Sequence, residues 1–261
     1  MDKRFTLPIA KITQETKDIN TYTFRHKLDA RPGQFIMLTD FEGGEKPFSI
    51  CDCNEDEFSI TVKRIGAFTN RLFEKRVGDL VSIRGAYGSS FFISKKRVLL
   101  VGGGYAVPTF NFLIDYLKNA GADITLVNGA RNKDEHVFAA RFSLKENIRI
   151  YNCTDDGSFG LKGTSVDIAK DLLENEEFDQ VYASGPEMMM KALQPYLEKY
   201  EYEFLFERYM KCAIGICGCC TMDPLGIRLC VEGPVLPKEK IVQLTEFGEY
   251  HRKASGSRIY F

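Results

Sequence analysis

The sequence reads VLLVGGGYAVP from Val98 to Pro108, and this stretch separates two different patterns in the chain. Its four opening apolar residues, with no polar residue between them, predict a strand that is buried on both faces. Apolar residues at mostly helical spacing continue as far as Leu117, so the glycines lie in a turn between a strand and a helix. We therefore predict that an α/β domain begins here.

The residues after this turn alternate between strand and helix patterns. Further strands are predicted at Ile124–Val127, Ile148–Tyr151 and Gln180–Ala183, and helices at Val166–Leu173 and Glu187–Tyr200. Alternation of this kind is typical of parallel βαβ units. We expect an open parallel α/β sheet within residues 96–206.

The first 95 residues carry another pattern. Short β-rich segments are separated by turns, at Phe5–Ile12, Thr21–His26, Gln34–Leu38, Lys46–Ile50, Phe58–Val62 and Leu80–Arg84. Short strands at this spacing predict an antiparallel β-barrel over residues 1–95. The predicted fold class is multi-domain α+β: this barrel, the α/β domain, a small cysteine module at 207–236 and a polar tail at 237–261.

The composition indicates a folded protein and argues against two kinds of partner. The chain has 261 residues, 44% of them hydrophobic, and its 35 Lys and Arg nearly balance its 36 Asp and Glu. A net charge of −1 does not supply the basic field that general nucleic-acid or anionic-membrane binding needs. No secretion signal is evident, and the apolar stretch Val98–Ile114 is interrupted and shorter than the about 20 residues that a bilayer requires. We expect a cytoplasmic protein.

The cysteines are unevenly distributed. Five of the eight fall within nineteen residues: Cys212, Cys217, Cys219, Cys220 and Cys230. Taking Cys212, Cys217, Cys220 and Cys230 gives the C-x4-C-x2-C spacing with a distant fourth Cys that is typical of plant-type [2Fe–2S] sites. Structural zinc is the alternative, but it usually uses two separated Cys pairs. Cys219 could replace Cys220 as a ligand, although the spacing favours Cys220.

Two glycine-containing turns follow predicted strands of the α/β domain. Gly102, Gly103 and Gly104 follow the first strand, and Ser184, Gly185 and Pro186 follow the last. A turn of this kind lets a pyrophosphate lie against the N-terminal amides of a helix. The spacing of these glycines is not G-x-G-x-x-G, and many strand-to-helix turns contain glycine for geometric reasons alone. The prediction of a nucleotide site therefore rests on the position of the turns between strands and helices.

Two segments of the barrel offer groups for a phosphate and a flat ring. Lys46, Pro47, Phe48 and Ser49 place a cation, an aromatic ring and a hydroxyl close together on one strand, with an ordinary barrel strand as the alternative. A second basic and Gly/Thr turn follows at Arg64–Asn70. The sequence contains no recognisable Ser/His/Asp set for hydrolysis. We expect the cofactors to supply the chemistry and no side chain to act as a catalyst.

The order of these parts resembles the ferredoxin–NADP reductase superfamily. The segments that carry this resemblance are Arg31–Phe35, Lys46–Ser49, the two glycine turns and the cysteine loop. Within the superfamily, Thr154–Gly163 and the segment Cys230–Val235 after the cluster loop resemble the electron-transfer subunits of class 1B dihydroorotate dehydrogenases. The similarity extends over about residues 5–236.

That resemblance implies three cofactors and a partner. FAD is expected in the barrel, with contacts from Lys46, Pro47, Phe48, Ser49, Val62, Lys63, Arg64, Thr69 and Asn70. NAD(H) is expected at Gly102, Gly103, Gly104, Ser184, Gly185 and Pro186, and a [2Fe–2S] cluster on Cys212, Cys217, Cys220 and Cys230. The implied partner is an FMN-containing catalytic subunit of dihydroorotate dehydrogenase, an enzyme of pyrimidine biosynthesis, in a heterotetramer with two copies of each chain.

The resulting hypothesis is an electron-transfer subunit. It takes a hydride from NADH onto FAD and passes single electrons through the cluster, or runs in the opposite direction during dihydroorotate oxidation. One alternative is a subunit of an NAD(P)H-dependent ferredoxin oxidoreductase or a sulfhydrogenase, and a more distant one is a zinc-stabilised interaction module without enzymatic activity. Lys46 stands where the family usually has Arg, and Arg131 could meet the 2′-phosphate of NADP. We expect Tyr260 and Phe261 in the tail to pack at an interface rather than at a cofactor.

Overall fold

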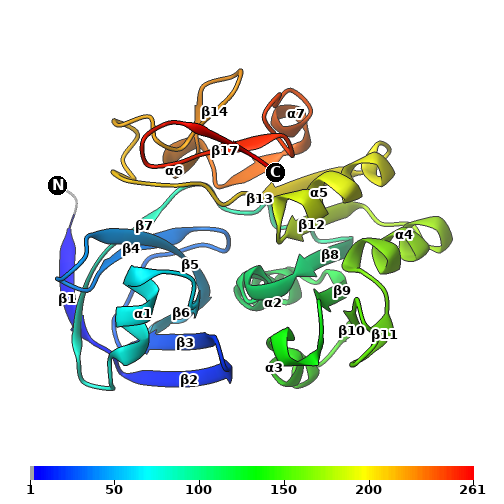
Figure 1. Cartoon of the computed structure of the whole chain (residues 1–261). Helices are drawn as coiled ribbons and strands as arrows, with labels where there is room; N and C mark the ends of the chain where they lie inside the picture. The colour runs from blue at the N-terminus through cyan, green and yellow to red at the C-terminus, as the bar shows by residue number, and fades with distance from the viewer. Residues whose placement is uncertain (1–2) are drawn as a thin grey trace.

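The computed structural model describes residues 3–261 and contains three regions. In Figure 1 a curved antiparallel sheet lies at lower left, an α/β sheet at lower right, and the C-terminal part of the chain lies across the top. The α/β sheet therefore contacts both of the other regions. The predicted fold class is confirmed.

The first sheet has seven antiparallel strands in the order β1-β7-β4-β5-β6-β3-β2. These strands are β1 (Arg4–Pro8), β2 (Lys11–Thr16), β3 (Ile19–Phe24), β4 (Phe35–Thr39), β5 (Glu45–Cys53), β6 (Phe58–Lys63) and β7 (Leu80–Tyr87). The sheet curls into a half-barrel around a core that includes Tyr22, Phe24, Ile36 and Ile60, all fully buried.

The predicted strand Phe5–Ile12 is two strands in the structure. β1 pairs with β7 and β2 pairs with β3, so the chain passes between opposite edges of the sheet within Ile9 and Ala10. Ile9 is 1% exposed, and its N–H donates to Asp79 while that of Ala10 donates to Thr23. Because the apolar pattern continues across this change of partner, sequence periodicity did not reveal it.

The Gly/Thr turn predicted at Arg64–Asn70 is the start of a helix, α1 (Ala67–Glu74). The hydroxyl of Thr69 accepts the N–H groups of Ile65 and Gly66 ahead of the helix. This side chain thereby satisfies backbone donors that a helix start leaves without partners. The N-terminus of α1 is fixed against the end of β6.

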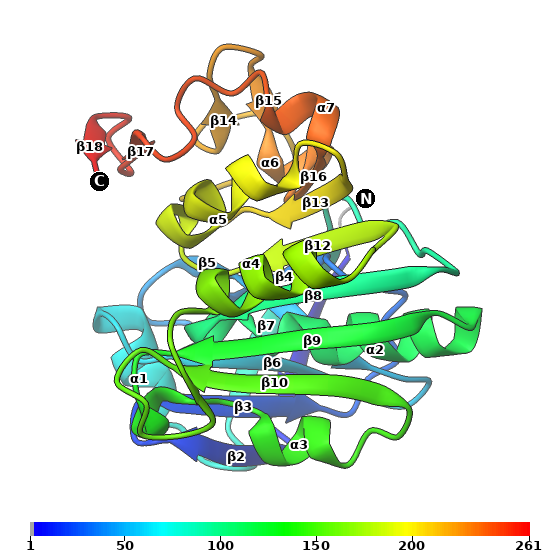
Figure 2. The ribbon, with the colours of Figure 1, turned by 90° about the vertical axis from the view of Figure 1, so that its right-hand side faces the viewer.

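The second sheet has the order β11-β10-β9-β8-β12-β13-β16, and Figure 2 shows its strands side by side. The strands are β8 (Arg97–Gly103), β9 (Asp123–Ala130), β10 (Ile148–Thr154), β11 (Leu161–Lys162), β12 (Gln180–Ser184), β13 (Glu201–Leu205) and β16 (Val235–Pro237). All neighbours are parallel except β13 and β16.

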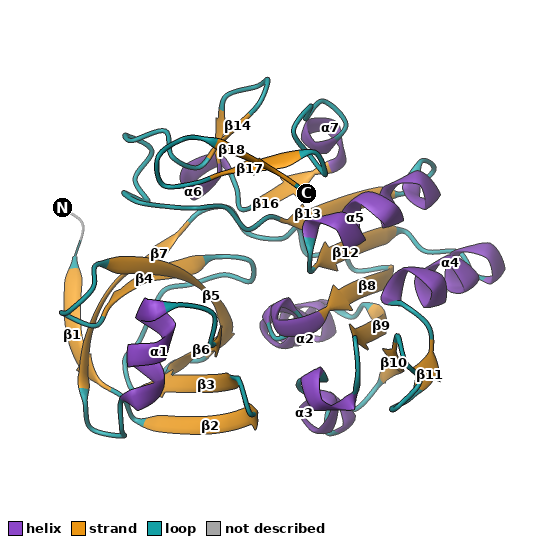
Figure 3. Ribbon diagram, in the orientation of Figure 1, coloured by secondary structure: helices purple, strands orange, loops and turns teal. Residues whose placement is uncertain are grey.

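Helices cover both faces of this sheet (Figure 3). They are α2 (Thr109–Ala120), α3 (Ala139–Ser143), α4 (Ser165–Asn175) and α5 (Glu187–Leu193). Along β8, Leu99 and Val101 belong to the core cluster that includes α4 and α5, while Val98 and Leu100 belong to the cluster that includes α2. Successive side chains of a strand point to opposite faces, which explains why this strand lacks polar positions.

The predicted helix Glu187–Tyr200 is shorter in the structure. After α5 the chain continues as the 3-10 helix η3 (Gln194–Leu197), which contains Pro195 at its start. Proline has no N–H to donate and clashes with the preceding turn of an α-helix. Two further 3-10 helices occur, η1 (Gly104–Ala106) after β8 and η2 (Lys133–Glu135) after β9.

Helix α2 lies between the barrel and the α/β sheet (Figure 1). Leu113 and Leu117 pack into the α/β core, whereas Phe112 belongs to the barrel core. The Asn111 side chain also donates to the carbonyl of Cys51 on β5, over 3.3 Å. This helix joins the two regions through both apolar and polar contacts.

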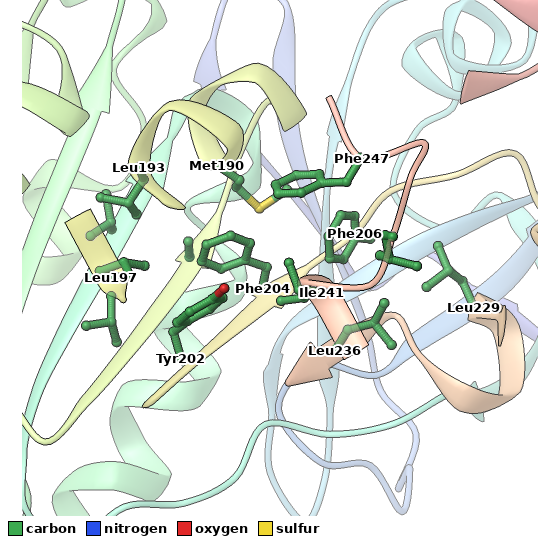
Figure 4. Packing of buried hydrophobic residues seen from close by; sticks show 14 of the residues in the cluster. Met190, Leu193, Leu197, Tyr202, Phe204, Phe206, Leu229, Leu236, Ile241 and Phe247 are labelled. Carbon is green, nitrogen blue, oxygen red and sulfur yellow. The ribbon is translucent and has the colours of Figure 1, made fainter. Parts of the chain in front are cut away.

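The tail after residue 237 is more buried than the sequence predicted. Helix α7 (Lys238–Ile241) follows β16, and Ile241, Leu244 and Phe247 are each no more than 7% exposed. Figure 4 shows Phe247 between Met190 and Phe206, beside Phe204 of β13. Strand β13 was also not predicted, although Glu201 and Glu203 alternate with the buried Tyr202 and Phe204, as in a strand with one buried face.

The remaining elements are short and lie near the C-terminus. They are β14 (Thr221–Met222), β15 (Ile227–Arg228), α6 (Leu229–Glu232), β17 (Tyr250–Arg252) and β18 (Arg258–Tyr260). β14 pairs with β15 and β17 with β18, each as a small antiparallel hairpin. Within residues 3–261, no helix has the length and apolar character needed to cross a membrane.

Phe247→Ala tests the packing of the tail. The ring of Phe247 is 1% exposed and lies 5.2 Å from that of Phe206. Its removal leaves a cavity, so we expect a loss of about 3–5 kcal/mol in the free energy of unfolding, measured in guanidinium chloride. Phe41→Ala is the control, because Phe41 is 59% exposed, and should change stability by less than about 0.5 kcal/mol. Equal effects would contradict the packing described here.

Candidate functional site

The α/β sheet has a reversal of strand order beside β8. The chain runs from β8 outward through β9, β10 and β11, then returns to place β12 on the other side of β8. Gly102 and Ser184 are paired across β8 and β12, so the two predicted glycine turns lie side by side. Open α/β sheets bind ligands beyond the carboxyl ends of their strands at such a point.

A cavity of about 700 Å³ lies at this reversal, and we call it the crevice pocket. Three of the six residues predicted for NAD(H) line it: Gly103, Gly185 and Pro186. The C-terminal hairpin lines the opposite side through His251, Arg252, Lys253, Ala254 and Phe261. The side chain of Phe261 thus faces a candidate cofactor pocket, in contrast to the interface position that we expected for it.

The other three predicted residues, Gly102, Gly104 and Ser184, do not line the crevice pocket. The Ser184 side chain is fully buried, accepts from the Thr109 hydroxyl and donates to the carbonyl of Ala106. Gly104 has φ of +59°, a conformation that favours glycine and turns the chain into η1. These residues support the floor of the pocket instead of facing it.

A second cavity, of about 190 Å³, lies between the barrel and the α/β domain, and we call it the interdomain pocket. Six of the nine residues predicted for FAD line it: Pro47, Phe48, Ser49, Val62, Lys63 and Thr69. The opposite side comes from Tyr105, Ala106, Pro108 and Thr109. The structure therefore brings together parts of β5, β6 and α1 with the glycine turn after β8.

Lys46, Arg64 and Asn70 do not line the interdomain pocket. The Lys46 ammonium lies 5.1 Å from the ring centroid of Tyr209. The Arg64 guanidinium donates to the side-chain oxygen of Asn70 over 3.0 Å. The segments predicted from the sequence are therefore close to the pocket, but their polar ends have protein partners.

The two pockets share a wall. Five residues line both of them: Ile65, Tyr105, Ala106, Glu207 and Arg208. The Tyr105 hydroxyl donates to the Glu207 carboxylate over 2.8 Å. Partial desolvation raises the pKa of Glu207 above its ordinary value, the hydrogen bond from Tyr105 opposes this rise, and the residue as a whole remains exposed.

Arg208 joins four segments of the chain. Its guanidinium pairs with Glu187 at the start of α5 and with Glu246 in the tail, and these three side chains are at most 6% exposed. The Glu246 carboxylate also accepts the N–H of Asp223 in the β14–β15 hairpin, and Glu187 accepts that of Gly248. The pairing outweighs desolvation and raises the pKa of Arg208.

The predicted cluster ligands lie together on one loop and the helix beside it. The N–H of Cys217 points to the sulfur of Cys212 over 3.4 Å, and the N–H of Cys230 points to that of Cys220 over 3.4 Å. Gly215 donates to the Cys230 sulfur over 3.3 Å, from a backbone with φ of +77°. A Cβ at this position would lie 2.9 Å from Val231, so the close approach requires glycine.

The environment of Cys212 favours a thiolate. Burial opposes ionisation, but backbone N–H groups of Cys217 and Ile214 outweigh it and lower the pKa of Cys212 to about 6. Thiolates that accept backbone N–H groups are suited to bind iron. Across residues 3–261, no three His, Cys, Asp or Glu side chains lie together as they would around a single metal ion.

Cys219 differs from its neighbours. Its sulfur lies 3.9 Å from the carbonyl of Cys217 and receives no backbone N–H among the interactions described for this loop. By contrast, Cys220 is 3% exposed and its sulfur accepts the N–H of Cys230. This difference favours Cys220 over Cys219 as the third residue of the predicted set.

Several pocket residues were not predicted from the sequence. Tyr105 lies inside the glycine stretch, but its partner Glu207 is 102 positions away. Glu207 and Arg208 come shortly after β13, the strand that was not predicted. Arg131, considered for a 2′-phosphate, is 70% exposed and pairs with Glu135 over 2.8 Å.

A family model for the iron–sulfur cluster binding domain of dihydroorotate dehydrogenase B matches residues 207–242. A protein of Methanocaldococcus jannaschii, named a probable dihydroorotate dehydrogenase B (NAD(+)) electron transfer subunit, is 38% identical over the full length of both chains. A protein of Pyrococcus furiosus with the same name is 40% identical and covers 95% of this chain and 96% of its own. The chain belongs to this family of electron transfer subunits.

Solved structures agree with the family. The structure of an NADH-dependent reduced ferredoxin-NADP oxidoreductase, studied for flavin-based electron bifurcation, is 30% identical, with a TM-score of 0.82 and coverage of 91% of this chain and 89% of its own. The ferredoxin reductase of carbazole 1,9a-dioxygenase is 20% identical with a TM-score of 0.65, and shows the fold alone.

These findings confirm the predicted family and electron-transfer function, together with the cofactor classes: an iron–sulfur cluster, a flavin and NAD(H). As a dihydroorotate dehydrogenase B electron transfer subunit, the chain has a catalytic dihydroorotate dehydrogenase subunit as its partner.

Arg208→Met tests the buried ion network. The substitution keeps most of the side-chain volume but leaves the carboxylates of Glu187 and Glu246 without their cation. We expect unfolding free energy to fall by about 3–5 kcal/mol, measured by denaturant titration.

Lys199→Met is the matched control, because Lys199 pairs with Glu177 where the two side chains are 61% and 80% exposed. Its removal should cost less than about 1 kcal/mol. A loss of similar size in the two variants would show that Arg208 does not hold this region together.

Proposed function

We propose that this chain carries electrons between NAD(H) and the FMN of a dihydroorotate dehydrogenase catalytic subunit, through FAD and a [2Fe–2S] cluster that it binds itself. One observation carries the proposal: the two pockets and the cysteine loop adjoin. The pockets share a wall, and Met210 and Pro234, at the two ends of the cysteine segment, line the interdomain pocket. Groups bound at these places would form one path for electrons.

The interdomain pocket is proposed for FAD. Phe48 offers an aromatic face and Ser49 a hydroxyl beside it, and the apolar wall includes Phe35 and Phe206. Lys63 and the N-terminus of the eight-residue helix α1 supply positive charge for phosphates. Pro47, Val62 and Thr69 complete the predicted lining, and Lys46, Arg64 and Asn70 are proposed for the part of the cofactor that extends beyond this pocket.

The crevice pocket is proposed for NAD(H). Gly103, Gly185 and Pro186 line it at the carboxyl ends of β8 and β12, where a nucleotide pyrophosphate can approach the backbone. We propose that Gly102, Gly104 and Ser184 shape this site from below. The pairing of Arg131 with Glu135 supports NAD over NADP, because the guanidinium already has a carboxylate partner.

The four cysteines of the predicted spacing are proposed as cluster ligands: Cys212, Cys217, Cys220 and Cys230. When bound, FAD exchanges electron pairs with NAD(H) and single electrons with the cluster. The chain's own part is to order these groups and to limit water between them. Phe35 and Phe206 serve this purpose in the interdomain pocket, since both line it and are at most 2% exposed.

The surface around the cysteine loop is proposed as the docking face for the catalytic subunit. Ile214, Ile216 and Val231 are 47%, 80% and 47% exposed although they are apolar, and Cys217 lies exposed among them in the chain. Apolar side chains gathered at the rim of a site are typical of an interaction surface. Docking there would bring the partner's FMN close to the cluster.

Two finer features of the assembly are also proposed. The family resemblance supports two copies of each chain in the complex. A location in the cytoplasm is supported by the four cysteines that are not proposed as cluster ligands, Cys51, Cys53, Cys153 and Cys219, because they are free thiols, as a reducing compartment maintains them.

The cluster assignment is tested with Cys217→Ser and Cys219→Ser, purified without oxygen. Cys217→Ser should lose most of the [2Fe–2S] signal that the reduced wild-type protein gives in electron paramagnetic resonance, because it removes one of four ligands. Cys219→Ser should keep that signal and the wild-type iron content. Protein that binds zinc and no flavin would contradict the proposed function, and loss of the signal in Cys219→Ser alone would exchange the roles of the two residues.

The docking face is tested with Ile216→Asp. A carboxylate at this exposed apolar position should weaken binding of the catalytic subunit at least tenfold, or about 1.4 kcal/mol, measured by calorimetry on the two purified subunits. Leu144→Asp is the matched control, because Leu144 is 83% exposed at the end of α3, far from the cysteine loop in Figure 1. Unchanged affinity in Ile216→Asp would place the partner on another face.

A further inference from the structure

One charged side chain hydrogen-bonds the backbone of the cysteine loop. Among the hydrogen bonds described for residues 3–261, the carbonyls of residues 211–220 accept from backbone N–H groups, from the Cys219 thiol and from Arg228. The Arg228 guanidinium donates to the carbonyl of Gly215 over 3.0 Å. It also lies close beside this glycine, since a Cβ on Gly215 would be 3.4 Å from Nη1 of Arg228. Arg228 therefore contacts the loop at the peptide that joins Gly215 to Ile216.

This part of the loop turns two N–H groups to two different proposed ligands. The N–H of Gly215 donates to the Cys230 sulfur over 3.3 Å, and the N–H of Ile216 is one of those that turn to the Cys212 sulfur. The Ile216 N–H belongs to the same peptide as the carbonyl that accepts from Arg228. A hydrogen bond to a carbonyl polarises its peptide and strengthens the N–H as a donor. Arg228 thus acts on the surroundings of two sulfurs through one hydrogen bond.

Two short elements hold Arg228 in this position. It pairs with Thr221 across the β14–β15 hairpin, which begins directly after Cys220. Its backbone N–H and its Nε both donate to the Glu232 carboxylate at the end of α6, over 2.9 and 3.2 Å. The planar fork of the guanidinium lets it donate to Glu232 and Gly215 at once. The side chain is therefore fixed by several contacts although it is 45% exposed.

The contact matters because a bound cluster changes its charge. A cluster held by four thiolates gains one negative charge on reduction, and hydrogen bonds to its sulfurs favour that state. Glu232 and the surrounding water and salt weaken the field of the Arg228 charge at longer range. The hydrogen bond to Gly215 acts by direct contact and is not weakened in this way. We therefore expect the hydrogen bond, more than the charge alone, to influence the cluster.

We propose that Arg228 raises the reduction potential of the cluster by holding the peptide between Gly215 and Ile216. The inference rests on the proposed function and assigns a residue to its single-electron step. In that step one electron arrives from the flavin side and one leaves to the partner, or the reverse. Arg228 keeps its proton throughout and forms or breaks no covalent bond. It is a positioning residue, and Ile216 on the proposed docking face belongs to the peptide that it holds.

The other charged residues near the proposed ligands are less suited to this task. Lys211 precedes Cys212 but is exposed and makes no hydrogen bond to the loop backbone among the interactions described. The Asp223 carboxylate accepts from the side chains of Tyr250 and Arg252 in the C-terminal hairpin. Neither residue holds a peptide whose N–H turns to a cysteine sulfur in the part of the chain that the structure describes.

The experiment uses the full chain loaded with FAD and cluster without oxygen, as wild type, Arg228→Met, Arg228→Lys and Lys211→Met. Arg228→Met removes both the charge and the hydrogen bond. Arg228→Lys keeps the charge but lacks the fork that reaches Gly215 and Glu232 together. Lys211→Met is the matched control, because it removes the same charge beside Cys212 and leaves the hydrogen bonds of the loop in place.

The first measurement is the midpoint potential of the cluster, from a redox titration followed by electron paramagnetic resonance. Arg228→Met should make reduction about tenfold less favourable, a fall of about 59 mV for one electron. Arg228→Lys should show about a threefold effect, and Lys211→Met less than about a twofold effect that disappears in high salt. The effect of Arg228→Met should persist in high salt. A wild-type potential in Arg228→Met, or equal shifts in Arg228→Met and Lys211→Met, would overturn the proposal.

The Lys variant keeps the test decisive if Arg228→Met takes up no cluster. In that case a wild-type potential in Arg228→Lys would overturn the proposal. The second measurement is pulsed electron paramagnetic resonance of the reduced protein in H2O and D2O, which detects exchangeable protons near the cluster. Couplings from the N–H groups of Gly215 and Ile216 should weaken in Arg228→Met and remain in Lys211→Met. Unchanged couplings in Arg228→Met would also overturn the proposal.

The same samples separate this inference from the proposed function. A wild-type chain that gives a [2Fe–2S] signal, together with Arg228 variants of unchanged potential, would overturn the role of Arg228 and leave the proposed function standing. A wild-type chain that takes up neither flavin nor cluster would overturn both.

Discussion

The arrangement of the pockets and the cysteine loop depends on the buried ion pairs of Arg208. Its guanidinium lies between the carboxylates of Glu187 and Glu246, all of them almost completely buried. Removing one of the three side chains would leave an unpaired charge in the protein interior, where it is poorly solvated. Separating the four segments that meet here would therefore cost considerable free energy. Helix α5 lines the crevice pocket, and β13 leads to the wall that the two pockets share. Glu246 belongs to the tail, and its partner Asp223 belongs to the cysteine module. One buried cation therefore aligns the crevice pocket, the interdomain pocket and the cysteine loop.

The sequence predicted those features that depend on local spacing. The apolar run from Val98 predicted a strand buried on both faces, and the spacing of Cys212, Cys217 and Cys220 predicted a cluster loop. Both patterns are short: a buried strand needs consecutive apolar residues, and a cluster loop needs cysteines a few positions apart. The strands of the half-barrel were predicted from local patterns as well. The break at Ile9 was missed because it depends on a change of partner strand, from β7 to β3, which the local pattern does not show.

The parts that escaped prediction depend on distant contacts. Glu207 was not singled out, since nothing near it in the sequence signals the hydroxyl of Tyr105. The tail looked polar because Phe247 and its few apolar neighbours are separated by charged residues. Among the candidate flavin residues, Arg64 and Asn70 turned toward each other, which the sequence motif did not indicate. In these cases tertiary packing determines which side chains are buried and which groups they bond to, and neither hydrophobic periodicity nor composition reveals it.

Helix α2 has a consequence for how the chain can be divided. Its first two turns have almost no solvent face, since Phe110, Phe112, Leu113 and Ile114 are at most 2% exposed, with Phe112 in one core and the others in the next. Cutting the chain near residue 95 would leave each piece with an uncovered apolar surface. We therefore expect barrel and sheet to unfold together in heat or denaturant.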